Sequence, residues 1–476
     1  MSSNEILALR KQGRIVEALD MARKEAAANP NNLKDVWFAR AYGWALYSHA
    51  NKLITLRKDN KLSEMAVANQ ISPYMREFSQ IANPLRKDMV FSQFLRIANE
   101  VSKYWPDFVY FAQWAGLDSF TDEDKKPYIV ENGTKIDSLE KRFTRAICRE
   151  IANLSIENQI NPELLQWGNQ VLKKALQDEP DNQWLNYYQS KILLAQGDYH
   201  NAIKSLLPTI RRQMKATWIW ALLAHVLEHI EPEDALTCYI YATQLAREEQ
   251  EVAKVRITLA EKLAEAQRYE EASFEVNKAL QYRESNNFKI PDQLNELKSQ
   301  TWYQENLIKN TLRPCVSVKM EAKELITELD KDNLTFEKGY IDHVNNEREL
   351  SYVVTGLDTG LGIYHKKFPD IKKLPVGTVV EVGFLKVDKK RPISWKLSSE
   401  QKIANLCDSF SGVLNKMEGK KFAFIKSGET NIFVPPDLAS SFSEARDVPV
   451  KCFAIRKANR EGKIGWRAVS LSKNDG

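Results

Sequence analysis

The sequence predicts a multidomain protein with an α-helical amino-terminal part and an all-β carboxy-terminal part. From residue 1 to about 310, apolar residues recur at spacings of three and four, the period of a helix that buries one face. After about residue 333 the period changes to two, as in half-buried strands. The 476 residues are enough for roughly three domains with sizeable cores.

Composition narrows the class of protein. Hydrophobic residues make up 43% and charged residues 28% of the chain, which is ordinary for a soluble globular protein. The first residues lack the apolar core of a signal peptide, and no apolar run is long enough to cross a bilayer. We therefore expect a cytoplasmic protein without a membrane partner. The five cysteines are far apart, so neither a disulfide framework nor a Cys-x-x-Cys zinc site is expected.

The positive charge is concentrated towards the carboxyl terminus. Residues 334–476 contain 24 Lys and Arg against 17 Asp and Glu, a net charge of +7, whereas residues 1–333 contain 44 against 46. This excess is compatible with a polyanionic partner, although lysine is also an ordinary solubilising surface residue. Charge alone leaves both interpretations open.

A repeat lies within the helical part. Three similar stretches each place an alanine near the start of a helix, at Ala202, Ala235 and Ala272. The alanines are 33 and 37 residues apart, and a small side chain there lets paired helices pack closely. An amino-terminal stretch has similar residues in the same register, namely Gly13, Ala18 and Pro30.

The repeat resembles tetratricopeptide repeats, whose period is about 34 residues. The matching residues are Gly197, Tyr199 and Ala202 in one copy and Tyr269, Ala272 and Ala279 in another. The resemblance implies a helical solenoid over residues 1–310 that holds a protein partner on its surface. Residues from about 50 to 160 fit the repeat poorly. Within them, Thr121–Arg142 is expected to be an inserted loop leading into a helix capped by Asp137 or Ser138.

The β part is predicted to contain two modules of similar plan after a connector at 311–333. Val376–Val387 and Val448–Lys457 both alternate, and each is followed by a charged turn and a last strand. This internal duplication places the modules at 334–399 and 408–473. Modules of this size with five short strands are typical of small barrels.

Two strand-like runs in the second module separate aromatic from aliphatic side chains. Successive side chains of a strand point to opposite faces, so one face carries Phe422, Phe424 and Phe433. The opposite face carries residues suited to a core, namely Ala423, Ile425, Ile432 and Val434. The aromatic face is flanked by Lys420, Lys421 and Lys426. Such a face suits stacking on unpaired bases while lysines neutralise phosphates.

This module resembles a cold-shock domain, an oligonucleotide-binding (OB) barrel, over nearly its whole length. The resemblance is carried by Gly412, Val413, Lys421, Phe422, Phe424, Ile425, Ile432, Phe433 and Val434. It implies that the three phenylalanines stack on bases of single-stranded RNA or DNA. The chain departs from the family where Pro435 replaces a His and Ala423 a Gly, and its opening strand lacks the usual Trp. The alternative is that the rings pack against a neighbouring domain.

The first module resembles the same OB or cold-shock family more distantly. Alignment to the same strands puts Tyr352 and His365 where the family has an aromatic residue and a histidine, which implies a role in binding nucleic acid. Ordinary strand packing is the alternative for both. Tyr364 fits either face. The turn Lys386–Pro392 is a candidate phosphate clamp or a solvated hairpin tip.

One motif raises the question of catalysis. HVLEH, His225–His229, matches the His-x-x-Glu-His pattern of one metallopeptidase group. Its helix lies in the repeat array, where an Ala- and Leu-rich helix is expected, so we expect no metal there. Walker loops, Gly-x-Ser-x-Gly elbows and catalytic carboxylate sets are not recognised in the sequence. We therefore expect a non-enzymatic protein with no catalytic residues, metal or cofactor.

These expectations combine into one functional hypothesis. The protein is an adaptor whose barrels bind single-stranded RNA or DNA and whose helical repeats bind a protein. The arrangement also resembles helical-repeat-plus-barrel proteins of bacterial conflict and antiviral systems. The alternatives are a scaffold that binds only proteins and, third, a metal-dependent hydrolase.

Overall fold

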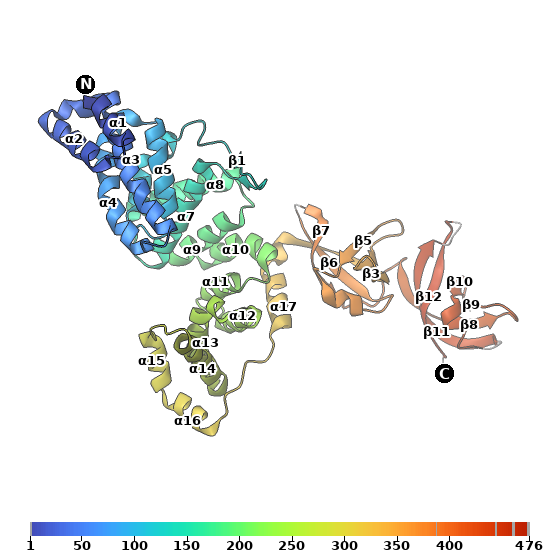
Figure 1. Ribbon diagram of the computed structural model, residues 1–476. Coiled ribbons are helices and arrows are strands. Elements are labelled where there is room, and N and C mark those ends of the chain that lie inside the picture. Colours follow the sequence, from blue (N-terminus) through green and yellow to red (C-terminus); the bar gives the residue numbers. More distant parts are fainter. Residues whose placement is uncertain (1, 387, 443–444, 459–461, 474–476) are drawn as a thin grey trace. The chain divides into compact units, whose positions relative to one another are not determined.

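The computed structural model describes residues 2–386, 388–442, 445–458 and 462–473. The chain divides into two compact units, Met1–Ala322 and Lys323–Gly476. The first unit is helical and the second contains two β modules, as Figure 1 shows. Among the described residues, no helix has both the length and the apolar character needed to span a membrane.

The helical unit contains sixteen α-helices among its described residues, and α17 connects it to the β modules. The first eight are α1 Ser2–Lys11, α2 Ile15–Ala28, α3 Val36–Lys58, α4 Glu64–Ile81, α5 Met89–Val101, α6 Phe108–Ala115, α7 Leu139–Ile156 and α8 Pro162–Asp178. The other eight are α9 Gln183–Ala195, α10 Tyr199–Gln213, α11 Thr217–Leu227, α12 Pro232–Leu245, α13 Ala253–Glu265, α14 Tyr269–Ser285, α15 Asp292–Ser299 and α16 Thr301–Lys309, and the connecting helix is α17 Lys319–Leu329. Short 3-10 helices of this unit lie at Pro30–Lys34, Asn83–Leu85, Leu117–Ser119 and Glu249–Glu251. Two more lie in the second unit, at Lys331–Asn333 and Pro369–Lys373.

The predicted repeat corresponds to successive pairs of helices. The pairs α9–α10, α11–α12 and α13–α14 each pack as a helical hairpin. Ala202, Ala235 and Ala272 lie in the second helices and are 0%, 2% and 0% exposed, so no larger side chain fits without displacing the partner helix. The amino-terminal copy is also a hairpin, α1–α2, with Ala18 buried.

Three of these hairpins share one turn. After the first helix a single residue takes a left-handed conformation, with φ of +78° at Gly13, +76° at Gly197 and +59° at Gln267. The next amide donates back to the carbonyl five residues earlier, as Asp198 N does to Leu193 O at 2.9 Å. This is the Schellman ending, which satisfies carbonyls that a helix end leaves open. The same turn therefore fixes where each second helix begins.

The irregular centre, α3 to α8, packs around a large aromatic core. The rings of Phe78 and Phe94 stack with centroids 3.7 Å apart. The predicted insertion contains a two-stranded hairpin, β1 Tyr128–Ile129 and β2 Lys135–Ile136. Ser138 caps α7 by accepting a hydrogen bond from Lys141 N at 3.2 Å, whereas Asp137 pairs with Arg145. The cap is therefore Ser138.

The second unit contains two modules with the same order of strands. The first comprises β3 Leu334–Asn345, β4 Leu350–Val354, β5 Gly360–Tyr364, β6 Val379–Leu385 and β7 Asp388–Leu397. The second comprises β8 Cys407–Lys416, β9 Ala423–Ser427, β10 Thr430–Val434, the short helix α18 Pro436–Ala439, β11 Ala445–Ala458 and β12 Ile464–Lys473. Hydrogen bonding runs β5-β4-β3-β6-β7 in the first and β10-β9-β8-β11-β12 in the second.

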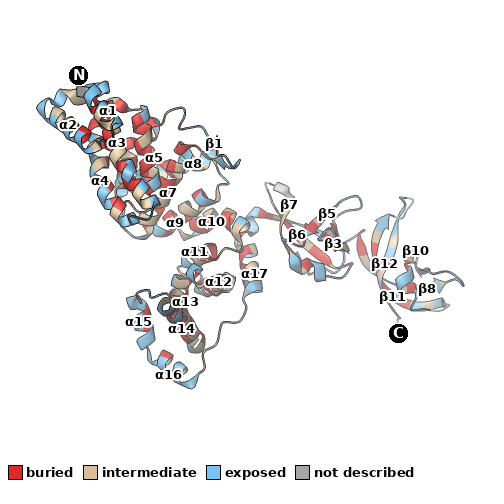
Figure 2. Cartoon of the chain, viewed as in Figure 1, coloured by how far each residue is buried: buried red, intermediate tan, exposed pale blue. Residues whose placement is uncertain are grey.

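The two modules differ in whether their strands close into a barrel. In the second, parallel pairing of β10 with β12 completes a five-stranded barrel, as predicted. In the first, no pairing joins β5 to β7 among the described residues, so the module is a five-stranded sheet rather than the expected closed barrel. The interior of the second is aliphatic, with Ile425, Ile432 and Val434 all fully buried. Figure 2 shows both buried and exposed segments in the strands, and in β9 buried residues alternate with exposed ones.

Candidate nucleic-acid interface

The three phenylalanines of the second module form one cluster on the outside of the barrel. Phe424 in β9 is paired across the ladder with Phe433 in β10, and Phe422 lies two residues before Phe424. Their ring centroids form a triangle with sides of 5.7, 5.8 and 5.8 Å. Phe424 is the most exposed of the three, at 46%, and Phe422 and Phe433 are half-buried. We call Phe422, Phe424 and Phe433 the phenylalanine face.

The aliphatic partners of these rings hold the face in place. Ile425 and Ile432, which alternate with the phenylalanines, are both fully buried and are cross-strand neighbours. Because each inward side chain is locked in the core, its neighbours in sequence must point outward. The barrel itself therefore presents the rings to solvent.

Cations surround the phenylalanine face. Lys420, Lys421 and Lys426 are exposed, and Lys426 follows Phe424 by two residues on the same face of β9. A fourth cation, Arg467 of β12, is the cross-strand neighbour of Phe433 and is also exposed. Within the described part of the chain, none of these four has a carboxylate within ion-pair distance. Their charges are thus open to an anionic ligand.

Arg467 was missed by sequence reasoning. Alternation in the last strand does place it opposite to the buried Ala468. Its position beside Phe433, however, depends on the parallel pairing that closes the barrel, and that pairing joins residues far apart in sequence. By contrast, Lys416 is a structural lysine, because its Nζ donates to Ala439 O at 2.9 Å and Phe442 O at 2.6 Å.

In the first module, the expected role of His365 is corrected. His365 is only 9% exposed, and its Nε2 lies 3.0 Å from Oγ of the buried Ser351. Ile363 points into the core, so alternation turns Tyr364 outward and His365 inward. Tyr364 is accordingly 63% exposed. His365 therefore fills the interior and is not available to a ligand.

Tyr352 has an aromatic neighbour on the adjacent strand. Its ring stacks on His343 of β3, with centroids 5.4 Å apart and planes inclined by 20°. His343 is an exposed residue and the cross-strand neighbour of Tyr352, and the sequence analysis did not single it out.

The candidate phosphate clamp at Lys386–Pro392 includes Val387, which lies outside the described residues, as do the side chains of 388–390.

The two β modules meet in a joint with an apolar centre and a polar edge. Its buried residues are Tyr340, Val379, Leu406, Cys407 and Ile455. At the edge, Lys457 Nζ of the second module binds both carboxylate oxygens of Asp342 in the first, at 2.8 and 2.7 Å. Tyr340 also donates its hydroxyl to Arg456 O at 3.1 Å.

The HVLEH motif lies on α11 and the turn after it. Glu228 accepts a hydrogen bond from Tyr239 at 2.6 Å, and His229 stacks on Tyr199 with centroids 4.5 Å apart. Across the described chain, no group of three or more His, Cys, Asp or Glu is arranged to hold a metal ion. Glu228 and His229 thus both have partners within the helical unit.

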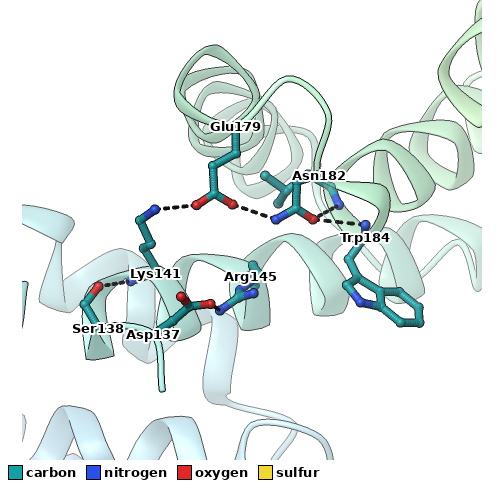
Figure 3. A network of polar contacts seen from close by, with 8 residues as sticks. Asp137, Ser138, Lys141, Arg145, Glu179, Asn182 and Trp184 are labelled. Atoms are coloured by element: carbon teal, nitrogen blue, oxygen red, sulfur yellow. Dashed lines mark hydrogen bonds and ion pairs between the residues drawn. The ribbon is translucent and has the colours of Figure 1, made fainter. Parts of the chain in front are cut away.

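A cavity of about 400 Å³, lined by both apolar and charged side chains, lies between α7, α8 and the start of α9. Figure 3 shows the contacts beside it: Lys141 binds Glu179, Glu179 accepts from Asn182, and Asp137 binds Arg145. The hydrogen bond to Glu179 raises the pKa of Lys141, and the same contact lowers the pKa of Glu179. Both groups stay charged near neutral pH, which suits a structural network better than proton transfer.

Comparison with known families gives two matches. Residues 408–471, almost all of the second β module, match the family described as S1/CSD-like domain 2 of the TOTE conflict systems. This match supports the prediction of a cold-shock-like domain. Residues 183–319, from α9 into the start of α17, match a domain of unknown function, DUF7017. A search of curated proteins finds no significant relative.

Proposed function

We propose that the protein is a non-enzymatic adaptor of a conflict system that binds single-stranded RNA or DNA through its β modules and a protein partner through its helical hairpins. The observation that carries the proposal is the phenylalanine face, three clustered outward rings beside four open cations. Rings of this kind stack on bases of any sequence, and the cations neutralise the backbone. The match to an S1/CSD-like domain of conflict systems supports the same assignment.

The proposal for the helical unit rests on its hairpins. Stacked hairpins of the tetratricopeptide kind expose long surfaces suited to a peptide or protein. In the helical unit, Trp184 of α9 is 40% exposed and stacks on Trp218 of α11, with ring centroids 5.2 Å apart. Exposed aromatic side chains are common centres of protein interfaces. A scaffold that binds only proteins is the alternative function, with the phenylalanine face as a further protein contact.

Binding of labelled single strands of about 20 nucleotides, longer than one OB fold covers, tests the proposal. Phe424→Ala and Phe433→Ala in the full-length chain should each weaken binding by about 1–3 kcal/mol, because each removes a stacking surface. Phe288→Ala is the matched control, since Phe288 is an equally exposed ring (50%) in the helical unit. Binding to a duplex of the same sequence should be weaker.

The salt dependence separates phosphate contacts from stacking. For single strands the logarithm of the binding constant falls by about 0.7 per neutralised phosphate for each tenfold rise in salt. Lys426→Ala should lower this slope, whereas Phe424→Ala should leave it unchanged. Absence of binding at low salt, or an equal effect of Phe288→Ala, contradicts the proposal and favours the protein-only scaffold.

A further inference from the structure

The first β module carries a counterpart of the phenylalanine face. Since both modules have the same strand order, their positions can be matched through cross-strand pairs. In the second module, Phe424 pairs with Asn415 on one side and Phe433 on the other. In the first, Tyr352 pairs with His343 on one side and Gly362 on the other. Tyr352 and Phe424 thus both lie on the outer face of the second strand of their modules, and His343 supplies a second ring from the neighbouring first strand.

The glycines of β5 leave room for this ring pair. Tyr352 lies over Gly360, where an added Cβ would be 2.7 Å from the ring and its hydroxyl. The tyrosine ring can therefore lie along the sheet and stack on His343. Tyr364, on the same face of β5, adds a third aromatic side chain at the edge, and this one is exposed. We call His343 and Tyr352 the histidine–tyrosine platform.

The platform is tied to the second module by one carboxylate. Asp342 is 8% exposed, and its Oδ2 lies 2.9 Å from His343 Nδ1 while both its oxygens bind Lys457 Nζ. The hydrogen bond to Asp342 orients the imidazole that stacks on Tyr352. Because Lys457 belongs to β11, the same carboxylate holds the platform in a fixed place relative to the second barrel.

Both aromatic surfaces border the joint. In the first module, Val354 follows Tyr352 by two residues on the same face of β4 and packs at the joint. In the second, Val469 packs at the joint two residues after Arg467, the neighbour of Phe433. The platform and the phenylalanine face therefore each have a strand neighbour that reaches the joint.

We propose that the two modules form one composite surface for a single continuous strand, on which the histidine–tyrosine platform is a second base-stacking site. This inference rests on the proposed function, because it takes the ligand to be single-stranded nucleic acid. It adds a ligand requirement, namely a strand long enough to reach from the phenylalanine face across the joint. Short strands bind the second module alone, and longer strands gain affinity from the first.

The test measures affinity of the full-length protein for DNA and RNA strands of about 6 and about 20 nucleotides, within and beyond the span of one OB fold. The wild-type protein should bind the long strand more tightly than the short one. The difference should exceed the statistical gain that comes from the larger number of binding positions on a long strand. Tyr352→Leu, which keeps an apolar side chain but removes the ring, should weaken long-strand binding about tenfold. It should leave short-strand binding unchanged. His343→Gln, which leaves Tyr352 in place, should act in the same direction.

Lys457→Ala tests the ion pair between Lys457 and Asp342. Photo-crosslinking shows where the strand lies on the protein. Loss of Lys457 should reduce the gain from length without changing short-strand affinity, whereas Phe288→Ala should change neither. A long photoreactive strand should crosslink to Tyr352 or His343, and a short strand to the phenylalanine face only. If short strands bind but Tyr352→Leu affects neither length, or affects both equally, the composite surface is wrong. If short strands fail to bind and Phe424→Ala has no effect, the proposed function itself is wrong.

Discussion

Neighbouring residues of β9 have opposite roles. Phe424 is 46% exposed and belongs to the phenylalanine face, whereas Ile425 is fully buried in the core of the same barrel. The separation results from the strand alone, since adjacent side chains point to opposite faces. A substitution at either position therefore tests one property without the other.

Stability measurements on this pair of residues give a first prediction. Ile425→Ala should lower the free energy of unfolding by about 2–5 kcal/mol, because it leaves a cavity among Leu414, Ile432 and their neighbours. Phe424→Ala should lower it much less, since Phe424 is 46% exposed and lies outside the core. Denaturant unfolding of both variants provides the comparison. A larger loss for Phe424→Ala would show that the ring is part of the core.

The second module could be predicted residue by residue because its alternation is strict. The inward set was assigned correctly from sequence, since each of its positions is buried; of the outward set, Phe424 is exposed and Phe422 and Phe433 are half-buried. His365 was misplaced because it was assigned by alignment to a family histidine rather than by alternation from Ile363, which gives the observed orientation. His343 gave no local signal, since only the pairing of β3 with β4 brings it to Tyr352.

At the scale of elements, the shared turn explains why the repeat was visible in sequence. Gly13 and Gly197 occupy the left-handed position at no steric cost, and an alanine follows five residues later in each copy. The centre of the helical unit lacks this spacing. Its helices are set by a core of large aromatic side chains, which can be arranged in many ways and leave no fixed period.

Gln267 occupies the same left-handed position with a side chain, which gives a second prediction. With φ of +59°, it carries a backbone strain that glycine avoids. Gln267→Gly should therefore raise the free energy of unfolding of the helical unit by about 0.5–1 kcal/mol. Gly197→Ala, the matched reverse change, should lower it by a similar amount. Thermal or denaturant unfolding of the two variants measures both changes. If Gln267→Gly lowers the free energy of unfolding, the prediction is wrong.

At the scale of the molecule, the chain combines two units of different character. The helical unit is close to neutral, and the excess of positive charge lies in the β unit, where open cations border the phenylalanine face. The sequence predicted this division, the period change and the duplication of β modules. It did not predict the joint, because Asp342 and Lys457 are distant in sequence and only the folded modules bring them together.

The joint depends on a buried carboxylate, and its response to pH can be derived. Burial alone would raise the pKa of Asp342, but the hydrogen bonds from Lys457 and His343 outweigh it, so the pKa is lower than the ordinary value of 3.8. A carboxyl whose pKa is lower in the folded protein stabilises the fold above its unfolded pKa. That stabilisation is lost as the pH falls through the folded value. The joint should therefore be intact at neutral pH and weaken below about pH 4.

A double-mutant cycle on Asp342 and Lys457 measures this contribution. Lys457→Ala leaves a carboxylate that is 5% exposed without its main partner. Breaking a buried pair costs about 3–5 kcal/mol, and we expect about 1–3 kcal/mol here, since Lys457 is 40% exposed and His343 remains bonded. The cycle of Lys457→Ala, Asp342→Ala and the double variant, read by denaturant unfolding, should give a coupling energy that is smaller at pH 3 than at pH 7. A coupling energy that is the same at both pH values would show that apolar packing at Tyr340 and Ile455, and not the ion pair, holds the modules together.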